Sequence, residues 1–335
     1  MLRRLLPSLC GRVVFRFALC AIALVAGMAQ AQPWKPTRPV VLVVGATPGG
    51  SLDLTARLLQ RVWEQQKIVG MPVVVLNKPG AGQGLAWEFM RDRGNDGHAI
   101  ALGGPNLASN SILGMHAIGY RDVTTIALLF DDYTAMVVRA DSPFRSMRDV
   151  VERLQKDPGA VTIAVGPALG GGAHIGTVVG LKAGGVRVPE VRFVVYKSAG
   201  EALTAVIAGE VDVAAGTVAN YPAHLPTGRI RVIGVTSPKR LGGAMAGAPT
   251  LREQGLDAVF TTWRSVVGPR AMTPAHVAFW EEALRRAVRS DEWQRDLERN
   301  FWSANFITGA AARSYVEQQG RLFRDIFTEL GMAKP

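Results

Sequence analysis

Short apolar runs alternate with helical patterns along most of the chain. The runs are rich in valine, isoleucine and alanine and end at glycine or proline, and apolar residues recur at helical spacing between them. They cover residues 40–44, 73–76, 99–102, 136–138, 161–165, 191–195, 211–215 and 230–235. Because such runs are apolar on both faces and separated by helices, they predict parallel strands with helical crossovers.

Helix starts are also legible in the pattern. Ser146 with Asp149, and Thr250 with Glu253, fit the capping box, and Thr273 stands before a proline that suits a first helical position. From Thr273 to the end we expect mainly helix. The strands fall into two sets, which predicts an α/β protein of two lobes, residues 32–134 plus 262–335 and residues 135–261. The ligand is expected between the lobes.

The N-terminal segment has the pattern of an export signal. Its arginines precede a short apolar core at residues 17–28, and Ala29-Gln30-Ala31 offers a small-residue cleavage pattern. A retained anchor is the alternative, but about 20 apolar residues are needed to cross a bilayer. A lipoprotein signal at Cys20 is disfavoured because Leu19 precedes it. We therefore predict residues 1–31 to be a signal peptide cleaved after Ala31, giving a periplasmic protein.

Cysteine content and charge narrow the function classes. Cys10 and Cys20 both lie in that segment, so the mature chain has no thiol for a disulfide, a metal or catalysis. It keeps 304 of the 335 residues, enough for two cores. The formal charge of +11 includes four signal arginines, and export makes nucleic acid an improbable partner. The remaining positive charge mildly favours anionic ligands.

Three glycine-rich segments lie where a predicted strand ends and a helix begins. They are residues 46–53 (ATPGGSLD), 77–84 (NKPGAGQG) and 166–174 (GPALGGGAH), named below the first, second and third loops. Glycines let the backbone approach a ligand, and a helix N-terminus presents unpaired N–H groups to an anion. One such loop could be only a tight turn, but three at carboxyl ends of strands favour a binding site.

Catalytic and cofactor motifs are incomplete. The second loop has Leu85 where a dinucleotide fingerprint needs its third glycine, and the first has Asp53 where a nucleophile elbow needs its second. The five histidines show no metal-ligand spacing, so we expect no metal or cofactor. Four of them are interpreted as surface or cap residues. Only His174, after the third glycine run, is placed near a ligand.

Arg264 is the strongest candidate for a charged ligand contact. It lies beside Trp263, before the apolar run at residues 266–268, where the chain is expected to return to the first lobe. A guanidinium can bind a carboxylate through two parallel hydrogen bonds, which lysine cannot do. An exposed arginine without a role is the alternative.

Several distinctive segments span nearly the whole mature chain, among them TPGGSLDLTAR, NKPGAG, ADSPFRSMRDV, YKSAGEAL, GRIRVIGVTSPKR and PTLREQGL. Together they resemble the Bug/TctC family of periplasmic receptors for tripartite tricarboxylate transporters. Trp263-Arg264, residues 300–302 and residues 307–309 are closest to the tricarboxylate-type branch. The resemblance implies a hinged, type II-like binding protein with no catalytic activity.

The resemblance also implies which residues hold the ligand. Carried over position by position, they are Thr47, Gly49, Gly50 and Ser51 in the first loop, Gly80 and Gly82 in the second, and Tyr133, Gly170, Gly171, His174, Ser198 and Thr217 elsewhere. Relatives often carry hydroxyl or carboxylate side chains where this chain has Gly171–Ala173 and Gly216, so the ligand's identity stays open.

A receptor that delivers a small di- or tricarboxylate to membrane permease subunits is the leading hypothesis. We expect it to act as a monomer. An extracytoplasmic sensor-input protein for a carboxylate is the alternative, since the closed form could engage a signalling partner instead. An exported hydrolase comes third, because the nucleophile elbow and metal ligands are missing.

Overall fold

The computed structural model describes residues 33–334. Every described helix and strand belongs to one compact unit that begins at Lys35. The predicted signal peptide, its cleavage site after Ala31 and both cysteines lie outside the described residues. Within the described part, no helix is both long and apolar enough to cross a membrane.

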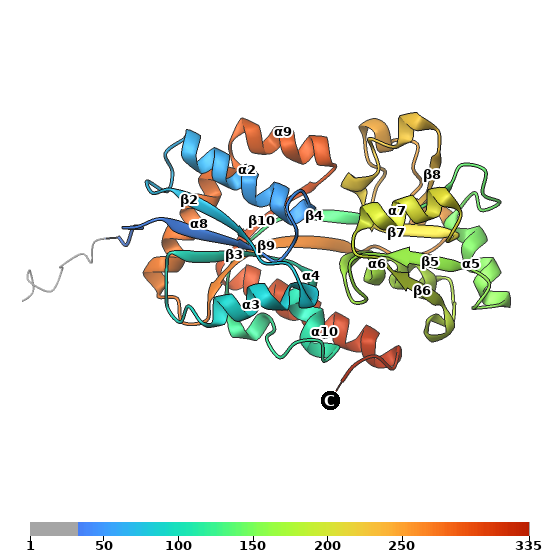
Figure 1. Ribbon diagram of the computed structural model, residues 1–335, viewed down its shortest axis with the longest axis horizontal. Coiled ribbons are helices and arrows are strands. Elements are labelled where there is room, and N and C mark those ends of the chain that lie inside the picture. The colour runs from blue at the N-terminus through green and yellow to red at the C-terminus, as the bar shows by residue number, and fades with distance from the viewer. Residues whose placement is uncertain (1–32, 335) are drawn as a thin grey trace, which may run out of the picture. The chain divides into compact units, whose positions relative to one another are not determined.

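Strands of this unit form two groups that share one long strand. β1 (Val40–Val44), β2 (Val73–Asn77) and β3 (Ala99–Gly103) are parallel, and β9 (Thr261–Pro269) continues that group antiparallel to β3. β5 (Thr162–Val165), β6 (Arg192–Val195) and β7 (Val213–Thr217) form a second parallel group. β4 (Val123–Arg139) passes through both groups (Figure 1).

Pairing along β4 changes at one point. Its first part pairs with β9 and β10 (Ser303–Thr308), with Tyr133 opposite Thr261 as the last pair to β9. From Thr134 onward it pairs with β7 and β8 (Ile230–Val235). The two groups are therefore joined through unbroken extended backbone.

Helices cover both groups (Figure 1). Two of the predicted caps are confirmed: Ser146 accepts a hydrogen bond from the Asp149 amide, and Thr273 accepts one from the His276 amide. The helices are α2 (Ser51–Gln65), α3 (Gly84–Arg91), α4 (Pro105–Ile112), α5 (Met147–Lys156), α6 (Gly172–Ala183), α7 (Ala199–Ala208), α8 (Pro274–Val288), α9 (Asp291–Asn300) and α10 (Gly309–Glu329).

Two predictions about the elements need correction. The prediction of a parallel sheet was wrong for β4, which is antiparallel to β7, β8 and β9. From Thr273 onward the described chain is mainly helical, as predicted, and β10 lies between α9 and α10. Thr250 and Glu253 do exchange the hydrogen bonds of a capping box, but the element that follows is the short 3-10 helix Arg252–Gln254.

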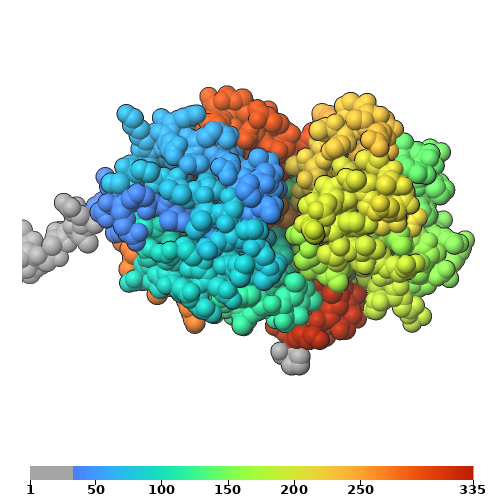
Figure 2. Space-filling model, in the orientation of Figure 1, coloured from blue at the N-terminus to red at the C-terminus, as the bar shows by residue number. Residues whose placement is uncertain are grey.

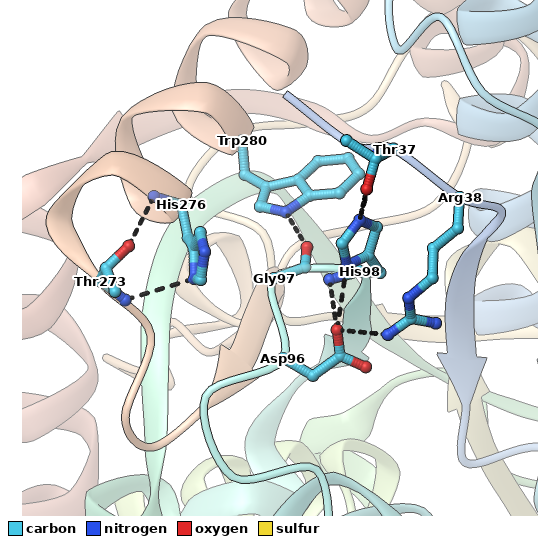
Figure 3. A network of polar contacts seen from close by, with 8 residues as sticks. All are labelled: Thr37, Arg38, Asp96, Gly97, His98, Thr273, His276 and Trp280. Atoms are coloured by element: carbon cyan, nitrogen blue, oxygen red, sulfur yellow. Dashed lines mark hydrogen bonds and ion pairs between the residues drawn. The ribbon is translucent and has the colours of Figure 1, made fainter. Parts of the chain in front are cut away.

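A polar network fixes the amino-terminal end of β3. Asp96 accepts hydrogen bonds from Arg38 at 2.8 Å and from the His98 amide at 3.0 Å, and Trp280 of α8 donates to the Gly97 carbonyl at 2.9 Å (Figure 3). Burial opposes ionisation of Asp96, but these hydrogen bonds win and hold its pKa below the usual value. His276 is a cap residue, as predicted, since its amide donates to Thr273, whereas His98 is a partly buried member of this network and not a surface or cap residue.

Candidate functional site

The first loop is a turn at the N-terminus of α2 that is held by internal hydrogen bonds. Asp53, buried in the first helical turn, accepts hydrogen bonds from the Gly49 amide at 2.9 Å and from Arg57 at 2.8 Å. Burial by itself would raise the pKa of Asp53, but these hydrogen bonds outweigh burial and hold the pKa below its usual value. The Gly49 amide is therefore engaged within the loop. Ser51 differs, because its Oγ is buried without a hydrogen-bond partner at the start of the helix.

The second loop is attached to the first. Asn77, at the end of β2, donates to the Ala46 carbonyl and to Asp53 Oδ1, both at 2.9 Å. Gly80 and Gly82 take φ values of 120° and 59°, in the left-handed range that favours glycine. The two loops therefore form one surface at the carboxyl edge of β1 and β2.

α4 extends this surface toward the second group of strands. Asn110 donates to the Gly82 carbonyl at 2.6 Å. α4 also lies close to the third loop, because a Cβ built on Gly170 would lie 3.5 Å from Ser109 Oγ. Ser109 and Asn110 are fully buried, and Ser109 Oγ and Asn110 Oδ1 have no hydrogen-bond partner. α4 therefore joins the second loop to the third with polar atoms that remain unsatisfied.

The turn that begins α4 is a fourth strand-to-helix turn, which the sequence reasoning missed. It comprises Gly103, Gly104 and Pro105, directly after the buried strand β3. A Cβ on Gly104 would lie 3.5 Å from Arg264 Nη1. The signal was present, since the turn has the same arrangement of strand, glycines and helix start as the three loops.

The third loop is buried and held by its own histidine. Gly171 caps α6, and the Gly170 amide donates to His174 Nδ1 at 3.0 Å. The His174 ring packs edge-on against Phe193 of β6, with centroids 4.6 Å apart. Burial lowers the pKa of His174 to about 4, so the ring is neutral at neutral pH. His174 braces this loop, a role that the sequence reasoning did not assign.

Ser198 and Thr217 lie at strand ends of the second group. Ser198 caps α7, its hydroxyl accepting the Glu201 amide at 3.1 Å, and it lies against Gly166 of the third loop. Thr217 is the last residue of β7, and its hydroxyl accepts a hydrogen bond from Asn220 at 2.9 Å. Both lie at the carboxyl edge of the second group.

Arg264 is not an exposed side chain. Only 6% of it is accessible, its Nη1 donates to the Thr262 carbonyl at 3.3 Å, and its Nε has no partner. The nearest carboxylate is that of Asp132, with 3.8 Å between Arg264 Nη2 and Asp132 Oδ2. Burial lowers the pKa of Arg264, and the neighbouring acids oppose that shift. Arg264 is thus a buried charge with a loosely held protein partner.

Asp132 was not among the predicted residues, whereas its neighbour Tyr133 was. Tyr133 donates its hydroxyl to Ser303 of β10 at 2.7 Å, which turns it away from Arg264. Asp132 is fully buried, and burial raises its pKa to about 6 against the opposing effect of Arg264. Thr217 and Trp302 also lower that pKa. Asp132 is therefore a second buried charged group beside Arg264.

A continuous series of contacts connects these parts. The first loop contacts the second, the second contacts α4, and α4 contacts the third loop. A Cβ on Gly172, in the third loop's helix, would lie 2.4 Å from Thr262 Oγ1 on β9. On the face in Figure 2, a narrow groove separates the blue-to-teal residues from the yellow residues of the second group. Among residues 33–334, no group of three or more His, Cys, Asp or Glu could hold a metal ion.

Comparison with known proteins identifies the family. The model of the tripartite tricarboxylate transporter family receptor matches residues 56–319. The chain belongs to this family. Its members are periplasmic solute-binding receptors and not enzymes, which removes the hydrolase hypothesis.

Individual relatives agree with this assignment. BugT of Bordetella pertussis is 28% identical over 265 residues, covering 76% of this chain and 78% of BugT. A UPF0065 protein of Cupriavidus necator is 28% identical to this chain over 319 residues, which cover 95% of each chain.

Solved structures confirm the fold. The periplasmic binding protein BugD is 23% identical with a TM-score of 0.77, covering 90% of this chain and 100% of BugD. MatC of Rhodopseudomonas palustris, solved with malate, is 22% identical with a TM-score of 0.75 over 87% of this chain and 99% of MatC. Another R. palustris protein, solved with adipate, is 24% identical with a TM-score of 0.78, covering 89% of this chain and 99% of that protein. The predicted α/β periplasmic-binding-protein fold is confirmed.

Proposed function

We propose that this receptor captures a small organic di- or tricarboxylate and delivers it to the membrane subunits of a tripartite tricarboxylate transporter. The observation that carries the proposal is the convergence of four strand-to-helix turns with one buried arginine. Helix N-termini offer partial positive charge to one carboxylate, and Arg264 offers a full charge to another. Malate and adipate in two structural neighbours are dicarboxylates, which agrees with this division of contacts.

The residues that the sequence analysis assigned to the site remain the proposed ligand contact set, with unequal support among them. Ser51 has a buried, unpaired hydroxyl at a helix start, and Arg264 has an unpaired buried Nε, so both have unused hydrogen-bonding capacity. The Gly49 amide, the His174 Nδ1 and the Tyr133 hydroxyl already have partners inside the protein. We therefore place Ser51 and Arg264 first among the proposed contacts.

Two lobes are proposed to close over the ligand, residues 32–134 plus 262–335 and residues 135–261. The change of partners along β4 at Tyr133 and Thr134 supports this boundary. Ligand would shift the population toward a closed state in proportion to its differential affinity. Small-angle scattering with and without saturating ligand tests the idea, and superimposable profiles would contradict closure.

Export with cleavage after Ala31 is part of the same proposal. N-terminal sequencing of the protein from the periplasm should begin at Gln32, and a full-length, membrane-retained product would contradict it.

A thermal-shift screen of aliphatic and aromatic di- and tricarboxylates tests the ligand class. A ligand that binds only the folded state raises the apparent stability by about 2.7 kcal/mol at 100 times its Kd. The screen should include neutral amides of the same acids as matched controls, which should give no shift. Shifts from the amides and none from the acids would refute carboxylate capture. Transport in vesicles with the permease subunits, against the receptor alone, tests delivery and separates it from a sensor role.

A further inference from the structure

Asp132 and Arg264 project from the same face of the β4–β9 ladder. Thr262 lies directly opposite Asp132, and Arg264 lies two residues further along β9. Opposed residues of an antiparallel pair share a face, and residues two apart on a strand do also. The flanking residue Asp131 lies on the other face, where Asn305 of β10 donates to it at 3.0 Å. Of the two neighbouring acids, Asp132 is the one on the same face of the ladder as Arg264.

Only one of the two oxygens of the Asp132 carboxylate has a hydrogen-bond partner. Its Oδ1 accepts the Tyr133 amide at 2.8 Å, whereas Oδ2 is buried without a hydrogen-bond partner. The 3.8 Å to Arg264 Nη2 is too long for a hydrogen bond. Arg264 Nε is likewise unpaired. A buried acceptor and a buried donor left open side by side are costly, and each unpaired group in a native structure calls for an explanation.

We propose that Asp132 is a specificity-determining residue that accepts a hydrogen bond from a donor on the ligand, next to the carboxylate that Arg264 binds. This rests on the proposed function above. The ligand class is then a di- or tricarboxylate with a hydroxyl or ammonium group on the carbon beside one carboxylate. Such a ligand supplies an acceptor to Arg264 Nε and a donor to Asp132 Oδ2 together.

Acids without the donor are disfavoured for a physical reason. Their carboxylate beside Arg264 also lies beside Asp132, and like charges in a buried site repel. Nothing then satisfies Asp132 Oδ2. Sites built to hydrogen-bond a substrate group reject analogues that lack it more strongly than apolar pockets reject a missing methylene.

Matched acids that differ only in the donor test the inference. Calorimetry should compare succinate with malate and aspartate, glutarate with 2-hydroxyglutarate and glutamate, and tricarballylate with citrate. A hydrogen bond to a buried charged group predicts a preference of about 10- to 150-fold for the donor-bearing member of the set that binds. The hydroxy and amino members show which donor the site takes.

Two variants assign the preference to Asp132. Asp132→Asn, which removes the charge at constant shape, should reduce the preference for an ammonium by about tenfold or more and that for a hydroxyl by less. Asp131→Asn, a change of the same kind on the opposite face, should leave the ratio within about twofold of wild type. Near-ultraviolet circular dichroism checks that both variants are folded.

The outcomes separate two failures. If carboxylates bind but wild type treats each matched set within about twofold, or Asp132→Asn keeps the full preference, this inference is wrong and the proposed function stands. If no carboxylate of any length binds, the proposed function itself fails. A preference that Asp132→Asn removes and Asp131→Asn keeps supports the inference.

Discussion

Replacing Arg264 with methionine should destabilise the ligand-free protein, because it leaves Asp132 buried without its counter-charge. Both side chains are almost fully buried, and 3.8 Å separates Arg264 Nη2 from Asp132 Oδ2. At that distance and an effective dielectric constant of about 20, two unit charges attract by about 4 kcal/mol, which sets the scale. Breaking a buried pair from one side costs about 3–5 kcal/mol. We expect a loss in that range from urea denaturation at about pH 8.

The pKa of Asp132 determines how the stability, and the loss caused by Arg264→Met, change with pH. The pKa of Asp132 is about 6 in the folded protein, above the ordinary value of 3.8, so the folded state binds this proton more readily than the unfolded state. Stability therefore falls as the pH rises through about 6, and it falls further without Arg264. At about pH 5 the folded-state Asp132 is largely neutral, so the same substitution should cost less than about half as much.

Two comparisons make the result interpretable. The double variant Arg264→Met with Asp132→Asn should recover more than half of the loss, because no charge is then left buried alone. Arg252→Met removes an exposed partner of Asp257 and should cost less than about 1 kcal/mol. A loss from Arg264→Met that is below about 1 kcal/mol, or equal at both pH values, would refute the reasoning.

Three further substitutions test the loops. Ser51→Ala should weaken binding of the cognate carboxylate by about 5- to 10-fold in calorimetry, at little cost in stability, because its buried Oγ has no protein partner; unchanged affinity would remove Ser51 from the site. Gly172→Ala should cost about 1–3 kcal/mol in thermal denaturation through its clash with Thr262, and Thr262→Ala in the same chain should restore most of it; a lack of rescue would contradict that contact. Asp53→Asn should cost about 1–3 kcal/mol near neutral pH, since it weakens the bonds from the first loop and Asn77. Because the pKa of Asp53 is lowered, this difference should fade as the pH falls through that pKa in acid titrations.

The sequence predicted the strands that read as short apolar runs, including β2, β6 and β8, which are not buried along their whole length. β1, β3 and β5 are buried along nearly their whole length, so their runs end where the strands end. β4 was recognised only over its last part, because Asp131 and Asp132 interrupt the apolar pattern. β10 was missed because Ser303, Asn305 and Thr308 are polar and none of its six residues is buried, so it has no clear apolar pattern.

The site shows a similar division. The glycine-rich loops were found because helix starts and tight turns are local features of sequence. The turn before α4 was missed because that helix has only eight residues and buries serine and asparagine, which hides its amphipathic pattern. Asp132 was not considered because the resemblance pointed to Tyr133 and no local pattern singles out Asp132. Which of two adjacent side chains faces Arg264 depends on strand register, and register is set by distant pairing.

β4 has a mechanical consequence for any relative motion of the two strand groups. Its backbone is extended from Val123 to Arg139 and is hydrogen-bonded to neighbouring strands along both edges. It therefore connects the two strand groups rigidly and not as a flexible linker. Rotation must then be absorbed by small changes in φ and ψ around Tyr133 and Thr134, beside the charge pair at Asp132. The proposed hinge residues are therefore neighbours of the charge pair proposed to contact the ligand, so we expect a ligand bound there to affect the motion of the two groups.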